Sequence, residues 1–318
     1  MPSKMSPKIR VRDAEKLKQI NPETKKLWNK YKVDMSLREL SEKTIAGYEN
    51  DFEHFILYVL DNFDNRSVTE LDESDITEFL FFCKTSGNNS RRIKRRMSTI
   101  SAFYNFLRKK KIITENPLEY IGRPKKDIDV ITPIFLTQEQ VDFMREKLKE
   151  CGNLDLHLYA MLSLSTMARV NAISQIQWEK IDFDNRVIND VLEKEGKIVT
   201  LFFSEEVKEL LLAVNEYRKT NEINDNGWVF FSKTGDKINA ITNGTLNQWC
   251  KRIGKMINVP GLYPHAFRKT GSSLLKNKGL PLEILSKLLH HESPETTIRH
   301  YVKEDMAKIQ QEKDKFGI

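Results

Sequence analysis

Apolar residues recur at three- and four-residue steps along most of this 318-residue chain, and that spacing predicts helices. The clearest run comprises Ile45, Tyr48, Phe52, Phe55, Ile56 and Val59, which share one helical face. Two β-rich runs, residues 186–192 and 197–203, interrupt this pattern, and Glu195-Gly196 between them predicts a hairpin. The sequence therefore predicts a mainly α fold with a small β-sheet.

The length favours two domains, since one domain usually takes about 100–200 residues. Residues 37–121 are predicted to form a small helical bundle, and residues 122–133 a basic, exposed linker. Residues 134–318 form the second predicted domain, with mixed helices and strands and a C-terminal tail. Residues 1–36 are predicted to be a basic N-terminal arm, either helical or a flexible extension.

Several classes of protein are disfavoured by what the sequence lacks. No run of about 18 apolar residues is present, which argues against a membrane-spanning helix and a membrane partner. The basic N-terminus has no apolar core typical of a secretory signal, and the three cysteines lie far apart without metal-ligand spacing. We therefore expect a reduced, cytoplasmic protein without a zinc site. A P-loop and a glycine-rich dinucleotide fingerprint are also missing, so no small-molecule cofactor is predicted.

The positive charge is concentrated in bands. The net charge of +7 is small for this length, but residues 91–126 carry 12 basic and two acidic side chains. Residues 37–90 are acidic, and residues 127–318 are nearly neutral. A dense basic segment suits a nucleic-acid backbone, although a solvated helix face is the alternative. The predicted DNA-binding residues are Arg91, Arg92, Lys94, Arg95, Arg96, Lys125 and Lys126.

A second set of residues, in the C-terminal half, could carry chemistry. Taken singly, each has an ordinary interpretation as a solvated charge, a helix end or a core residue. No Gly-x-Ser-x-Gly motif supports a serine hydrolase, and the histidines lack zinc-ligand spacing. The set consists of Arg169, Lys194, Lys197, His265, Arg268, His291 and Tyr301.

Taken in order, this set resembles the tyrosine recombinase (phage integrase) family, which carries Arg, a hairpin Lys, His-x-x-Arg, a His or Trp and a Tyr. The segments STMARVNAISQIQWEKIDF and HAFRKTGSSLLKNKGLPLEILSKLLHHESPETTIRHYV are similar to the family's segments around the first Arg and at the end of the catalytic domain. The resemblance extends back to about residue 41. It implies a helical core-binding domain followed by a mixed α+β tyrosine-recombinase catalytic domain.

The resemblance also implies a reaction. Tyr301 would attack the scissile phosphate and form a 3′-phosphotyrosine, leaving a free 5′-hydroxyl that later reverses the step. The covalent link stores the phosphodiester bond, so neither a metal nor a cofactor is expected. Arg169 and Arg268 would clamp the phosphate oxygens, because guanidinium groups stay ionised and offer several fixed donors.

Three further roles follow from the same resemblance. His265 would accept the proton of the Tyr or orient the phosphate. Lys194 would protonate the leaving 5′-oxygen, with Lys197 as the alternative. His291 would donate a hydrogen bond to a phosphate oxygen. The implied partners are double-stranded DNA and further copies of this chain, as a tetramer on paired sites.

The chain departs from the family's pattern at three places. Ala172 stands where the family usually has a carboxylate that supports the first Arg, and Leu289-His290-His291 replaces Leu-Gly-His. Tyr301 follows His291 by ten residues rather than nine, and one residue turns a helical position by about 100°. These departures leave two alternatives to a recombinase: a DNA-binding regulator that no longer cleaves, and a nuclease or topoisomerase-like nicking enzyme.

Overall fold

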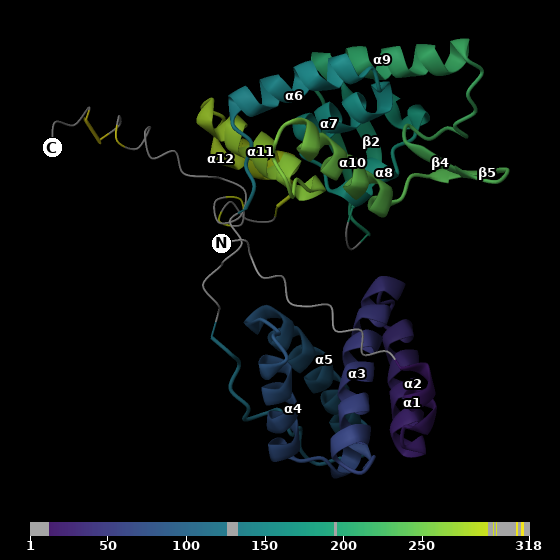
Figure 1. Cartoon of the computed structure of the whole chain (residues 1–318), viewed down its shortest axis with the longest axis vertical. Helices are drawn as coiled ribbons and strands as arrows, with labels where there is room; N and C mark the ends of the chain where they lie inside the picture. The colour runs from purple at the N-terminus through teal and green to yellow at the C-terminus, as the bar shows by residue number, and fades with distance from the viewer. Residues whose placement is uncertain are drawn as a thin grey trace. The chain divides into compact units, whose positions relative to one another are not determined.

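The computed structural model describes residues 13–125, 133–193 and 196–291, together with residues 295, 297, 310, 313 and 314. The chain divides into two compact units, residues 1–132 and 133–318 (Figure 1). The predicted mainly α fold with a small β-sheet is confirmed. Among the described residues, no helix combines the length and apolar character needed to cross a membrane.

The first unit is a helical bundle with an aromatic core. Side chains of Asn21, Ser41, Asp72 and Asn89 cap the N-termini of its four longer helices by accepting backbone N–H groups. Its elements are α1 (Ala14–Gln19), α2 (Pro22–Leu37), α3 (Glu42–Asn62), the 3-10 turn η1 (Val68–Glu70), α4 (Glu73–Thr85) and α5 (Ser90–Lys109).

Helix α2 belongs to this bundle, although the sequence assigned residues 1–36 to an arm. The Trp28 ring stacks on Phe52 of α3, with centroids 3.8 Å apart, and meets Phe103 of α5 edge-on. Tyr31 and Met35 are also buried, so α2 presents an apolar face at helical spacing. The lysines of α2 lie on the opposite face, and their number made the apolar spacing difficult to recognise from the sequence.

The second unit combines seven helices with five strands among its described residues. The helices are α6 (Gln138–Cys151), α7 (Leu154–Thr166), α8 (Val170–Ser174), α9 (Glu205–Thr220), α10 (Asn243–Met256), α11 (Pro264–Asn277) and α12 (Leu282–Leu288), with the 3-10 turn η2 (Trp178–Lys180). Strands β1 (Ile181–Asp182), β2 (Val187–Leu192) and β3 (Ile198–Phe202) form an antiparallel sheet in that order. The predicted hairpin of β2 and β3 is confirmed. A second hairpin pairs β4 (Phe231–Thr234) with β5 (Lys237–Ala240).

A close approach of two helices shapes the part of this unit that carries the candidate site. Helix α7 is buried along almost its whole length, and α11 lies beside it (Figure 1). At Gly271 a side-chain Cβ would lie 2.4 Å from the backbone oxygen of Leu164, so only glycine permits this approach. The packing brings the C-terminal end of α7 next to the first turns of α11.

Candidate active site

Arg169 stands at the turn between α7 and α8. Met167 ends α7 in the left-handed conformation, with a φ of 54°, and Arg169 two residues later is the N-cap of α8. Its guanidinium group binds the carboxylate of Glu193, which follows β2. The Arg169 side chain is 34% exposed and that of Glu193 only 1%, so the arginine faces solvent from a buried anchor.

Arg268 lies in the second turn of α11 and is almost fully buried. Its Nη1 donates to the backbone oxygen of Met167 at 2.6 Å, and its Nη2 donates to that of Leu289 at 2.5 Å. The guanidinium group therefore joins the end of α7 to the end of α12. Because Met167 precedes Arg169 by two residues, these bonds bring the two predicted phosphate-binding arginines into one site.

His291 completes this group of contacts. Its Nε2 lies 3.1 Å from Nη2 of Arg268, and its Nδ1 lies 2.8 Å from the Thr297 hydroxyl. Burial, together with the charges of Arg268 and Arg169, lowers the pKa of His291 to about 4, so its ring is neutral at pH 7. Arginine only donates, so Nε2 accepts and the proton sits on Nδ1. His291 thus supports Arg268 in this arrangement, and the predicted donation to a phosphate oxygen, which would require the proton on Nε2 instead, stays a prediction.

The neighbouring His290 faces the hairpin rather than Arg268. It has a φ of 54°, its Nε2 lies 3.3 Å from the Thr200 backbone oxygen, and its Nδ1 lies 3.8 Å from Oε1 of Glu193. The Nζ of Lys197 donates to the His290 backbone oxygen at 3.4 Å. The end of α12 is therefore joined to β3 and to the residue that anchors Arg169.

The remaining predicted catalytic residues divide into two groups. His265 lies in the first turn of α11, half-buried and three residues before Arg268, as its spacing predicted. Lys194 and Tyr301 lie outside the described residues. No group of three side chains of the metal-binding types is found within residues 13–125, 133–193 and 196–291 or at the isolated described positions.

The predicted DNA-binding cluster lies on the first two turns of α5. Asp51 of α3 is fully buried beneath it and pairs with Arg95 at 2.6 Å and Arg92 at 3.4 Å. Arg96 differs from its predicted exposed position: its side chain is 3% exposed, its Nε lies 4.0 Å from Asp51, and its Nη1 donates to the Cys83 sulfur. Arg96 shares the apolar stripe of α5, so it neutralises Asp51 inside the bundle.

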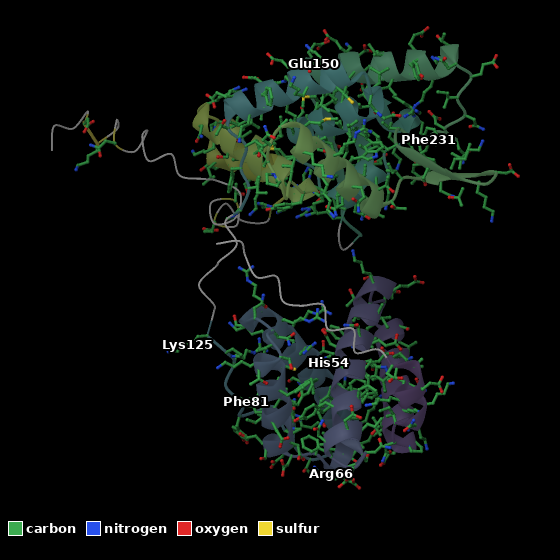
Figure 2. The ribbon with its side chains drawn as sticks, in the orientation of Figure 1. His54, Arg66, Phe81, Lys125, Glu150 and Phe231 are labelled. Atoms are coloured by element: carbon green, nitrogen blue, oxygen red, sulfur yellow. The ribbon has the colours of Figure 1, made fainter. Side chains whose placement is uncertain are left out.

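The other predicted DNA-binding residues differ in the exposure of their side chains. Arg91 and Arg95 are exposed, Lys94 is half-exposed, and Lys125 is exposed near the end of the described part of the first unit (Figure 2). Lys126 lies outside the described residues. The exposed basic surface therefore consists of the outer face of the first turns of α5, with Lys125 in the following segment.

The chain matches two sequence models that together span both units. Residues 134–308 match the phage integrase family, and residues 29–111 match the N-terminal SAM-like domain of phage integrases. This chain belongs to the phage integrase family. The resemblance inferred from the sequence is confirmed, as is the order of a helical core-binding domain and a mixed α+β catalytic domain.

Curated relatives and solved structures agree with this assignment. The recombinase is 28% identical over 288 residues to tyrosine recombinase XerC of Pediococcus pentosaceus, covering 85% of this chain and 91% of the relative. It is also 28% identical over 279 residues to XerC of Herpetosiphon aurantiacus, covering 85% and 88%. The chain is a site-specific DNA recombinase of the tyrosine class.

Solved integrase structures share its fold. A Tn1549 transposon integrase in complex with transposon right end DNA matches with a TM-score of 0.69 at 18% identity, over 92% of this chain and 98% of that one. A lambda integrase dimer bound to a COC′ core site matches with a TM-score of 0.68 at 17% identity, over 87% and 94%.

Two important residues of this recombinase were missed from the sequence. Glu193 continues the alternation of β2, in which Val191 points inward and Leu192 outward, so it occupies an inward position. A glutamate at such a position next to a candidate catalytic lysine is a signal of a buried charge pair. Asp51 sits next to Phe52 on the inner side of α3, where a carboxylate also requires a cation.

Proposed function

We propose that this recombinase cleaves and rejoins double-stranded DNA through a 3′-phosphotyrosine on Tyr301. The observation that carries the proposal is the joint anchoring of Arg268 on Met167 and of Arg169 on Glu193. Two fixed guanidinium groups stabilise the negative charge that gathers on the non-bridging phosphate oxygens. Their anchors hold them in place before the substrate arrives, so little reorganisation is needed during the reaction.

The chemical step balances without a cofactor. The Tyr301 oxygen forms a bond to phosphorus, the bond from phosphorus to the 5′-oxygen breaks, and His265 receives or directs the tyrosine proton. Lys194, or Lys197 as the alternative, supplies a proton to the leaving 5′-oxygen. A 5′-hydroxyl then attacks the phosphotyrosine and restores a phosphodiester.

The exposed cations of α5 are proposed to bind the DNA backbone. Arg91, Lys94 and Arg95 share this surface with Arg92, and Lys125 adds a further positive charge. Asp51 fixes the positions of Arg92 and Arg95 while leaving each side chain partly exposed. Such contacts neutralise phosphates and set the position of the protein on the duplex, while base contacts give specificity.

Assembly on paired sites as a tetramer is proposed by similarity of fold. A lambda integrase tetramer bound to a Holliday junction matches this chain with a TM-score of 0.64 at 15% identity. With cellular DNA as its substrate, the enzyme is expected to act in the cytoplasm.

A covalent trapping experiment tests the proposal. A binding site is first selected from a random duplex pool with the full chain. A nick is then placed close to the cleavage point, so that the short fragment carrying the free 5′-hydroxyl dissociates and the strand cannot be rejoined. The full chain should form a protein–DNA adduct that survives denaturing electrophoresis and is lost in Tyr301→Phe. Tyr217→Phe, an exposed tyrosine on α9, is the matched control and should keep the adduct. Specific binding without any adduct would instead support the DNA-binding regulator.

A further inference from the structure

The carboxylate expected to support Arg169 is missing from the sequence position where the family places it. Ala172 on α8 is completely buried within the apolar core of the second unit, so that site offers no charge. The structure nevertheless provides Arg169 with a carboxylate partner. It comes from the β2–β3 hairpin, as Glu193.

Glu193 is firmly fixed by its surroundings. Its backbone N–H donates to the Lys197 oxygen at 2.8 Å, which closes the hairpin, and its side chain is 1% exposed. Burial alone would raise the pKa of this carboxyl, yet His290, Arg169 and Arg268 together lower it below its ordinary value. Glu193 is therefore ionised at neutral pH, and its charge is held beside the two arginines.

His290 closes the other side of this carboxylate. It adopts a left-handed conformation, which is unfavourable for a residue other than glycine, at the place where the family usually has glycine. In this conformation the ring Nε2 hydrogen-bonds to the Thr200 backbone oxygen, and the ring Nδ1 lies 3.8 Å from Oε1 of Glu193. His290, one departure from the family pattern, thus lies beside the carboxylate that pairs with Arg169.

We propose that Glu193 is the positioning residue for Arg169, with the His290 ring packed against the carboxylate. The inference rests on the proposed function, because Arg169 acts on the scissile phosphate there. Lys194 follows Glu193 directly in the sequence. The same carboxylate therefore couples the orientation of Arg169 to the docking of the hairpin that carries the proposed general acid.

A purely structural role for Glu193 makes different predictions. If Glu193 only secured the hairpin, its replacement would lower thermal stability, and a change at Arg169 would add its own independent loss. If Glu193 acts through Arg169, cleavage slows while DNA affinity and stability stay nearly unchanged. The effects of the two residues on cleavage would then overlap rather than multiply.

The experiment uses the full chain and the nicked duplex described above, with cleavage measured under single-turnover conditions. Glu193→Gln keeps the shape of the side chain and removes its charge, and we expect cleavage to slow about 30- to 100-fold, as for a misplaced catalytic group. DNA affinity should stay within about threefold, because only the reaction step is affected. Glu193→Asp keeps the charge and should cleave faster than Glu193→Gln. Glu205→Gln, which alters an exposed pair with Arg186, is the control and should cleave at the wild-type rate.

His290→Gly separates positioning from stability. Glycine is comfortable in the left-handed conformation, so the melting temperature should stay the same or rise, while cleavage slows several-fold. A wild-type cleavage rate in Glu193→Gln, with a Tyr301-dependent adduct still formed, would overturn this inference alone. The absence of any adduct from the wild-type chain would overturn the proposed function, and this inference with it.

Discussion

Replacing Gly271 by alanine tests how the packing of α7 and α11 controls the reaction. The added Cβ would lie 2.4 Å from the Leu164 backbone oxygen and 2.8 Å from Cγ of Met167. The first of these atoms belongs to the backbone of a buried helix and cannot rotate away. Restoring an ordinary contact of 3.4 Å therefore requires the two helices to separate by about 1 Å.

The size of the effect follows from this displacement. Overpacking a core costs about 1–3 kcal/mol, and the better helix propensity of alanine offsets up to about 1 kcal/mol, so a net loss of about 1–2 kcal/mol is expected. The catalytic effect is larger, because Arg268 on α11 bonds at 2.6 Å to Met167 at the end of α7. A shift of about 1 Å in a catalytic group lowers the rate about 100-fold.

The assay measures the cleavage rate on the nicked duplex and the free energy of unfolding in urea for the same preparations. Gly244→Ala on the exposed side of α10 is the matched control, since its Cβ would meet only the Thr242 hydroxyl at 3.5 Å. The control should keep the wild-type rate. If Gly271→Ala also cleaves at the wild-type rate with unchanged stability, the reasoning from this helix contact is refuted.

Three further predictions concern buried charges. Asp51→Asn leaves Arg96 buried without its counter-charge and should cost about 3–5 kcal/mol in urea unfolding; an unchanged midpoint would count against the pair. His54 lies inside the first unit (Figure 2), and burial, with Arg96 and Arg92, lowers its pKa from 6.5 to about 3. The unfolded chain therefore binds the extra proton between these values, and stability falls as the pH falls. His54→Phe should lose about 3 kcal/mol less than the wild type between pH 6.5 and 4 in urea titrations, and equal slopes would contradict the assignment. Arg268→Lys should slow adduct formation about 1,000-fold, since one ammonium nitrogen cannot reproduce the spread donors with which two guanidinium nitrogens reach the two carbonyls and a phosphate; full activity would exclude this clamp.

The local pattern of the sequence was enough to predict most of the helices. The stripe from Ile45 to Val59 lies on the buried face of α3, and the two predicted β-rich runs pair as β2 and β3. These features depend on neighbours within a few residues. The ordered motif from Arg169 to Tyr301 also identified the family, because its residue types and spacing are specific.

Features that depend on distant partners were not predicted. Arg96 was counted with its exposed neighbours because its buried partner, Asp51, lies 45 residues away on another helix. Glu193 was not recognised because its partner, Arg169, lies 24 residues earlier and on a different element. In both cases the sequence contained the charged residue, and only the packing showed that its side chain is directed inward against a partner.

The central claim is that Tyr301 becomes covalently bound to DNA. The most direct measurement is to trap the adduct on the nicked duplex, digest the protein and locate the nucleotide-bearing peptide by mass spectrometry. The account predicts a 3′-phosphate linked to Tyr301, and no adduct in Tyr301→Phe. A nucleotide on any other residue, or sequence-specific binding without an adduct, would contradict it.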